Sequence, residues 1–136
     1  MTPVSLAAVD AQEALLAAAF AAGDVERVRP LYRPDVVYVS PTTRLFGWPS
    51  PVEGVDRTLE FIALTVSEIS AIAYAVEERA LVGDAAAYVK VRFDFDTRDA
   101  RLRSEYVVVY RYRDGRIARQ ELYYDPSGVL ERCEPR

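Results

Sequence analysis

The residues of this chain that could do chemistry are mostly tyrosines, spaced two apart along predicted strands with a serine and a glutamine among them. Period-two spacing puts side chains on one face of a sheet, so these groups would share an inner face. Tyr38, Tyr110 and Tyr124 are the candidate catalytic hydroxyls, because a phenol can donate a hydrogen bond to a carbonyl or a developing enolate. The residues expected to bind substrate beside them are Ser40, Trp48, Tyr74, Val91, Phe93, Tyr106, Val108, Gln120 and Leu122.

Histidine is absent from the sequence. This removes the usual general base at neutral pH, the Ser-His and Cys-His nucleophile pairs, and the commonest transition-metal ligand. We therefore expect no metal and no cofactor. Any single tyrosine could be a core residue that satisfies its own hydroxyl. Several that converge with Gln120 favour a pocket for a hydrophobic small molecule, because apolar walls with a few placed polar groups are typical of such sites.

Charge argues against a nucleic-acid partner. The 136 residues include 17 basic and 21 acidic ones, for a net charge of −4. Four arginines crowd one predicted hairpin, but acidic residues lie between and beside them, which predicts a solvated mixed-charge face. These arginines are Arg111, Arg113, Arg116 and Arg119. No segment reaches the length of a membrane span. Cys133 is the only cysteine, so nothing indicates an oxidising compartment and we expect the protein in the cytoplasm.

Carboxylates offer few candidates for acid-base work. Asp35 begins a predicted strand and is expected to be exposed, although burial that raised its pKa would make it a base. Asp125 follows the last predicted strand and is expected to cap a turn. Arg92 and Asp94 alternate with the apolar residues of their strand, so we expect them on the wet face as a solvated pair. A β-bulge in that strand would exchange its two faces.

Helical signals come first along the chain. Asp10 and Glu13 resemble a capping box for a helix over about 11–22, which Gly23 ends. Asp24 begins a shorter helix that carries Val25 and Val28. A strand is expected over 36–40, then an apolar loop over 41–51. Residues 50–53, with the sequence Ser-Pro-Val-Glu, resemble a second capping box. The buried stripe of the third helix would contain Leu59, Ile62, Ala63 and Val66.

The periodicity then changes to two, which predicts strands over about 71–79, 86–96, 104–113 and 117–124. Helices followed by a meander predict an α+β fold in which three N-terminal helices pack on a curved, mostly antiparallel sheet. We expect residues 1–136 to form one domain, with 126–136 as a frayed tail. Two registers are possible for the hairpin at Asp114-Gly115. A two-residue turn would pair Tyr110 with Arg119, whereas a type I turn with Gly115 left-handed would pair it with Ala118. The second buries more, so we prefer it.

The outer face of the predicted sheet carries two apolar residues near its centre, Val107 and Val109. A partly apolar exposed sheet could close a two-fold homodimer. Two isolated surface valines would be equally ordinary.

Four segments resemble the NTF2-like superfamily and, within it, the SnoaL-like polyketide cyclase branch. They are Ala22-Gly23-Asp24, Asp35-Val-Val-Tyr-Val-Ser-Pro41, Gly54, and Asp114-Gly-Arg-Ile-Ala-Arg-Gln-Glu-Leu-Tyr-Tyr-Asp125. The resemblance implies a cone of sheet closed by helices. The superfamily also includes the ketosteroid isomerases. Their catalytic base would fall on Ser40 of this chain, and their oxyanion-binding Tyr and Asp would fall on Leu16 and Val108. All three roles are vacant in this chain, so that reaction is not expected.

The resemblance implies three kinds of function. The first is a cofactor-independent cyclase, isomerase or dehydratase acting on a polyketide- or terpenoid-like molecule. The second is a ligand-binding or dimerisation domain without catalysis. The third is an epoxide hydrolase, which the spacing of Arg92 and Asp94 matches and which requires both side chains to face the pocket. The final Asp of the hydrolase set would fall on Leu122.

Overall fold

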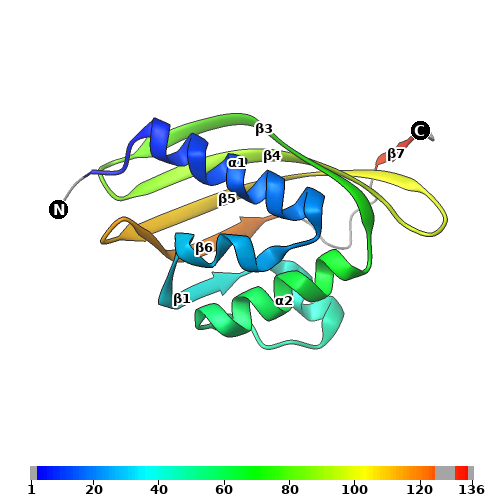
Figure 1. Ribbon diagram of the computed structural model, residues 1–136, viewed down its shortest axis with the longest axis horizontal. Coiled ribbons are helices and arrows are strands. Elements are labelled where there is room, and N and C mark those ends of the chain that lie inside the picture. The colour runs from blue at the N-terminus through cyan, green and yellow to red at the C-terminus, as the bar shows by residue number, and fades with distance from the viewer. Residues whose placement is uncertain (1–2, 125–130, 135–136) are drawn as a thin grey trace.

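The computed structural model describes residues 3–124 and 131–134. Helical segments fill most of the first half and strands fill the second (Figure 1). The elements are α1 (Leu6–Ala22), the 3₁₀ helix η1 (Val25–Leu31), β1 (Tyr32–Val39), the 3₁₀ helix η2 (Pro41–Phe46), β2 (Val52–Glu53), α2 (Val55–Ser67), β3 (Ser70–Val82), β4 (Ala86–Asp96), β5 (Arg101–Arg113), β6 (Arg116–Tyr123) and β7 (Glu131–Cys133).

The strands form one curved sheet in the order β2-β1-β6-β5-β4-β3. β1 runs parallel to β6 and the other pairs are antiparallel. β7 pairs with β5 beyond the end of β6. α1, η1 and α2 all cover the same face of the sheet (Figure 1), with α1 packed against β3 and α2 against β1. This confirms the predicted α+β fold. The core and any interior site therefore lie between this sheet face and the helices.

α1 begins earlier than predicted. Ser5 is its N-cap, and the Ser5 hydroxyl accepts a hydrogen bond from the Ala8 backbone N–H at 3.1 Å. The alanine-rich turn that follows has high helix propensity, which explains the earlier start. The predicted capping box was therefore wrong. Asp10 pairs with Arg79 of β3 at 2.8 Å, and Glu13 is buried.

The capping box predicted for the third helix was also wrong. Val52 and Glu53 form β2 instead, pairing with Tyr38 and Val37 of β1. Gly54, with φ +89°, is the N-cap of α2 and offers no side-chain cap. The buried stripe of α2 also differs from the predicted one. Leu59 and Ile62 are buried, as predicted, and Val66 is half-buried, but Ala63 is exposed, while Thr58 and Phe61 are buried.

The β5–β6 hairpin adopts neither predicted register. Asp114 and Gly115 both have positive φ (+54° and +78°), as in a type I′ turn, and Arg113 pairs with Arg116 across it. The register then shifts by one residue at a bulge on β6, so that Tyr110 pairs with Gln120. This shift reverses the faces beyond it. Gln120 and the cavity side of β6 therefore point inward, as the preferred register required, although by a different pairing.

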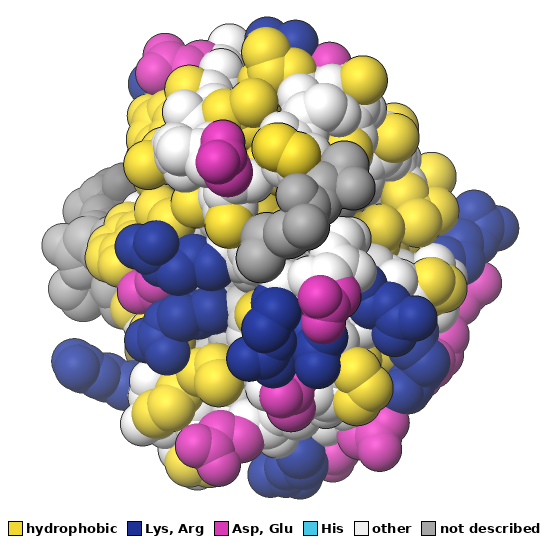
Figure 2. Space-filling view, turned by 90° about the vertical axis from the view of Figure 1, so that its left-hand side faces the viewer, with side chains coloured by type: hydrophobic (Ala, Val, Ile, Leu, Met, Phe, Trp, Pro, Cys, Tyr) yellow, Lys and Arg dark blue, Asp and Glu magenta, His cyan; other side chains and the backbone are white. Residues whose placement is uncertain are grey.

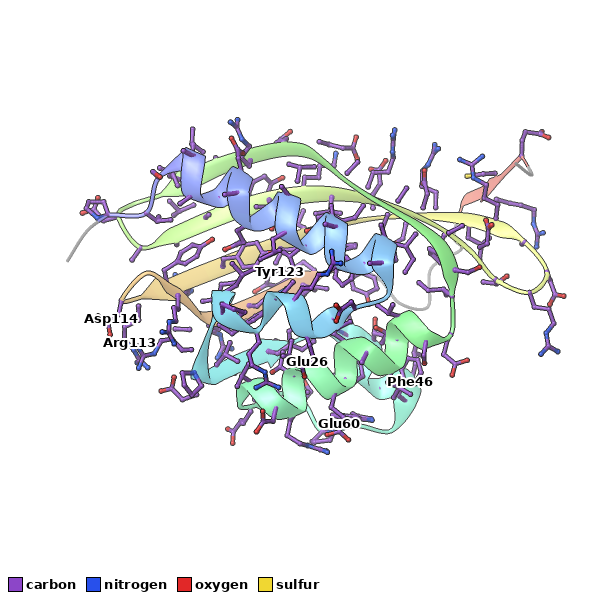
Figure 3. The ribbon with its side chains drawn as sticks, in the orientation of Figure 1. Glu26, Phe46, Glu60, Arg113, Asp114 and Tyr123 are labelled. Atoms are coloured by element: carbon purple, nitrogen blue, oxygen red, sulfur yellow. The ribbon has the colours of Figure 1, made fainter. Side chains whose placement is uncertain are left out.

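Charged side chains of both signs gather at the end of the molecule that carries the β5–β6 turn (Figure 2). Arg33 contacts Asp114 at 3.0 Å, and Arg113 contacts Asp35 at 2.7 Å. Arg113 and Asp114 lie at the tip of the hairpin, beside β1 (Figure 3). Ion pairs thus link the hairpin to β1, in keeping with the mixed-charge face expected for these arginines.

The predicted frayed tail was wrong for residues 131–133, which pair with Arg101–Arg103 of β5. The rest of the predicted tail, apart from 134, and the predicted turn cap Asp125 lie outside the described residues. Among the described helices, none is long and apolar enough to cross a membrane.

Candidate functional site

A cavity of about 390 Å³ lies between the inner face of the sheet and the helices. Its walls are mostly apolar, with Leu16 and Phe20 from α1 and Phe61 and Ile62 from α2. Most of its polar groups are hydroxyls, with one amide. They belong to Tyr32, Tyr38, Ser40, Thr42, Thr65, Tyr74, Ser104, Tyr106, Tyr110, Gln120 and Tyr124. Glu68, which is exposed at the end of α2, is the one charged residue that lines the cavity in the described part of the chain.

The structure brings most of the predicted site residues together around this cavity. Period-two alternation accounts for them, since they come from the inner faces of the strands, with Ser40 and Tyr124 continuing the alternation one residue past the ends of β1 and β6. The predicted residues that line the cavity are Tyr38, Ser40, Tyr74, Phe93, Tyr106, Val108, Tyr110, Gln120, Leu122 and Tyr124.

Two predicted residues do not line it. Val91 is fully buried in the core. Trp48 packs on Phe61 with ring centroids 5.1 Å apart, and the Arg57 guanidinium lies 4.3 Å from the centroid of its ring. The place at the cavity that the sequence assigned to Trp48 is taken by η2. Leu45 and Phe46 of that helix line the cavity and are exposed, and Phe46 lies against α2 (Figure 3).

Tyr32 is a cavity residue that the sequence analysis missed. Its hydroxyl donates a 2.6 Å hydrogen bond to Oε1 of Gln120. The amide nitrogen of Gln120 is then the group that can donate to a bound molecule. Tyr32 lies between Pro30 and Pro34, in the stretch that separates the predicted shorter helix from the strand predicted over 36–40. Continuing the alternation back from Tyr38 and Val36 would have found it.

A buried carboxylate behind the tyrosines was also missed. Glu13 of α1 is 4% exposed. Its Oε1 accepts a hydrogen bond from the Tyr74 hydroxyl at 2.6 Å. Its Oε2 accepts from the Tyr110 hydroxyl at 3.0 Å and from Nε2 of Gln12 at 3.2 Å. Glu13 lies four residues after Val9 and three before Leu16, so the helical spacing already placed it on the buried face of α1.

Burial dominates the acid-base properties of these groups. Desolvation raises the pKa of Glu13, and the hydrogen bonds from Tyr74, Gln12 and Tyr110 oppose part of that rise. Burial likewise raises the pKa of the Tyr38 hydroxyl, while the Ser40 hydroxyl acts in the opposite direction. Neutral tyrosines are hydrogen-bond donors and acceptors, so the cavity wall offers directed hydrogen bonds with little charge.

The other carboxylates considered from the sequence lie elsewhere. Asp94 points to the outer face of β4, as expected, but the predicted solvated pair with Arg92 was wrong: Asp94 is buried there, at 7% exposed, and its carboxylate contacts Nε of Arg103 at 2.8 Å. Neither Arg92 nor Asp94 lines the cavity. Asp35 is exposed. Desolvation would raise its pKa, but hydrogen bonds and charge from Arg33 and Arg113 outweigh this effect and lower it. Asp35 therefore lacks the raised pKa that a base role required.

The positions compared with ketosteroid isomerase all line the cavity. Ser40, Leu16 and Val108 are buried there, and Leu122, compared with the final Asp of the hydrolase set, lines it too. None of the four side chains ionises near neutral pH. Among the described residues, no three His, Cys, Asp or Glu side chains lie close enough together to hold a metal ion.

The profile of the SnoaL-like domain matches residues 13–120. No curated protein matches the chain. A Catenulispora acidiphila DSM 44928 protein with a ketosteroid isomerase-like fold, in complex with trimethylamine, has 17% identity and a TM-score of 0.72 over 91% of this chain and 89% of its own. A putative polyketide cyclase of Sinorhizobium meliloti has 18% identity and a TM-score of 0.65 over 85% and 98%. An LEH-like epoxide hydrolase of M. tuberculosis has 17% identity and a TM-score of 0.68 over 88% of this chain and 84% of its own.

Proposed function

We propose that this chain, which belongs to the SnoaL-like domain family, binds a hydrophobic, oxygenated small molecule of polyketide or terpenoid type and promotes its cyclisation, isomerisation or dehydration. The observation that carries the proposal is the cavity of about 390 Å³ with apolar walls and several hydroxyls. Sites for small molecules typically have volumes of roughly 300 to 1,000 Å³. The tyrosine rings therefore leave room for a ligand, and do not fill the interior themselves.

Hydrogen bonding in the cavity supports a role for two of the predicted hydroxyls. Tyr38 and Tyr124 line it without an acidic partner among the described residues. Each can donate to a ligand carbonyl and to the enolate formed from it, and the Gln120 amide nitrogen can orient the same oxygen. Tyr110 differs, because its hydroxyl hydrogen is directed to Glu13.

Shape is the second contribution that we propose. Aromatic side chains from both layers pack around the cavity, such as Tyr106 against Tyr124 at 5.7 Å and Phe20 against Tyr74 at 5.4 Å between centroids. Rigid walls that hold a flexible substrate in a folded, near-reactive shape lower the barrier to ring closure without a strong base.

The alternative function is a ligand-binding domain without catalysis. It is favoured by the side chains at the three isomerase positions, Ser40, Leu16 and Val108, which supply no ionisable group. The epoxide hydrolase alternative lacks such support, because Arg92 and Asp94 lie on the outer face.

The test begins with native mass spectrometry of protein purified from its own host, to identify a retained metabolite. Turnover of that compound, or of its precursor, is then measured for Tyr38→Phe and Tyr124→Phe. We expect each to lower kcat at least tenfold, since loss of one oxyanion donor costs roughly 2 to 4 kcal/mol. Tyr123→Phe is the matched control, because Tyr123 precedes Tyr124 but is exposed on the opposite face. Unchanged turnover in both cavity variants would contradict the catalytic proposal and favour binding alone.

A further inference from the structure

The hydrogen bonds around Glu13 give one end of the cavity a definite polarity. Glu13, Gln12, Tyr74 and Tyr110 form what we call the Glu13 cluster. Tyr74 and Tyr110 line the cavity, whereas Glu13 does not. The carboxylate thus lies one side chain away from a bound molecule and acts on it through the two tyrosines.

The direction of these hydrogen bonds follows from the groups involved. A carboxylate only accepts, so the hydroxyls of Tyr74 and Tyr110 must donate to it. Each hydroxyl has one hydrogen, and that hydrogen is now used. What each tyrosine oxygen still offers to a ligand is a lone pair.

We propose that the Glu13 cluster makes this end of the cavity a site for a hydroxyl group, such as that of a phenol or an enol, and discriminates against ligands that can only accept hydrogen bonds there. The inference rests on the proposed function, since it assumes a ligand in this cavity. It reverses the role predicted for Tyr110, which becomes an acceptor for a ligand hydroxyl. Carbonyl recognition then falls to Tyr38, Tyr124 and Gln120.

The surroundings of Glu13 agree with this polarity. The titratable groups that act electrostatically on or with it are phenols from three strands, with no arginine or lysine among them in the described residues. These phenols are Tyr32, Tyr74, Tyr106, Tyr110 and Tyr112. An ionised Glu13 therefore depends on donors from Tyr74, Tyr110 and Gln12, which keeps the tyrosine hydrogens directed to it. Replacing Glu13 by a neutral residue should allow at least one of these two hydroxyl hydrogens to point into the cavity.

A pair of probes separates donation from shape. 2-Naphthol carries a hydroxyl hydrogen, and 2-methoxynaphthalene has the same rings and an oxygen that only accepts. Isothermal titration at pH 8 measures the dissociation constant of each with wild type, with Glu13→Gln, and with Glu121→Gln as control. Glu121 also accepts from a tyrosine, Tyr123, at 2.8 Å, but on the outer face of the sheet.

We expect wild type and Glu121→Gln to bind 2-naphthol about tenfold more tightly than 2-methoxynaphthalene, because only the naphthol completes a hydrogen bond to the buried oxygens. In Glu13→Gln the amide offers one acceptor oxygen and a donating nitrogen. One tyrosine hydrogen then turns to the cavity, and the preference should fall to about threefold or less. Lowering the pH through the raised pKa of Glu13 protonates the carboxylate, so it should also reduce the preference of wild type for 2-naphthol over 2-methoxynaphthalene.

Equal affinities in wild type would overturn this inference while leaving the binding pocket intact. So would a preference that Glu13→Gln retains in full. Tyr110→Phe and Tyr74→Phe provide a second route if Glu13→Gln does not fold: each removes one acceptor and should weaken 2-naphthol more than the methyl ether, and equal weakening of both ligands would count against the inference. Failure of both naphthalenes to bind wild type would overturn the proposed function and this inference with it.

Discussion

Replacing Tyr74 by phenylalanine should destabilise the protein more than the same replacement of Tyr110, which carries the other hydroxyl of the Glu13 cluster. In the described chain Tyr74 is the one donor to Oε1 of Glu13, at 2.6 Å, whereas Oε2 accepts from both Tyr110 and Gln12. Hydrogen bonds to charged groups contribute about 1.5 to 3 kcal/mol, and a buried acceptor left without a donor costs its desolvation as well. We therefore expect a loss of about 2 to 3 kcal/mol for Tyr74→Phe.

For Tyr110→Phe we expect about 1 to 2 kcal/mol, because Gln12 still serves Oε2. Urea unfolding at pH 8 measures these free energies, and differential scanning calorimetry should show a drop of about 7 to 10 °C in Tm for Tyr74→Phe. Tyr123→Phe removes an exposed hydroxyl that donates to Glu121 at 2.8 Å, so it should cost under about 0.5 kcal/mol. Equal losses for Tyr74→Phe and Tyr123→Phe would show that burial of Glu13 does not set the strength of its hydrogen bonds.

Two further predictions concern Glu13 and the outer face. Burial raises the folded-state pKa of Glu13 above its ordinary 4.5. The free energy of unfolding of wild type, measured with urea, should therefore fall relative to that of Glu13→Gln as the pH rises from about 4.5 through the raised pKa. Below pH 4.5 the difference between the two free energies should stay constant. A homodimer through the outer sheet face, where Val107 and Val109 are half-buried, predicts twice the 15.3 kDa chain mass by light scattering and a monomer for Val109→Glu; a wild-type monomer at micromolar concentration would rule this interface out.

The hairpin shows how far local patterns extended. Alternation and the Asp114-Gly115 signal predicted the hairpin and the inward direction of Gln120. The pairing itself was wrong because a one-residue bulge on β6 lies between the turn and Gln120. A bulge leaves little trace in a single sequence, since the extra residue, Ala118, suits either face. The inward face survived because burying Leu122 and Gln120 beside Tyr110 satisfied the same hydrophobic pattern.

The loop after β1 shows a different limit. The sequence predicted an apolar loop over 41–51 and placed Trp48 of that loop at the binding site. Which aromatic side chain reaches the cavity depends on the 3₁₀ turn of η2, which directs Phe46 there and leaves Trp48 on Phe61. Propensity does not determine that choice, because it follows from how η2 packs against α2.

The sequence predicted the long helices and the long strands in their correct order, though not η2, β2 or β7, together with the resemblance to the family and the inward residues of β4 and β5. It could do so because side-chain alternation is a local property of extended backbone. Only the tertiary structure decided the acid-base character of the site. Glu13 meets Tyr74 and Tyr110 across 61 and 97 residues of chain, and such a contact depends on how α1 docks on the sheet. That docking converts an apparent helix-cap residue into a buried carboxylate and sets the direction in which two tyrosine hydroxyls donate.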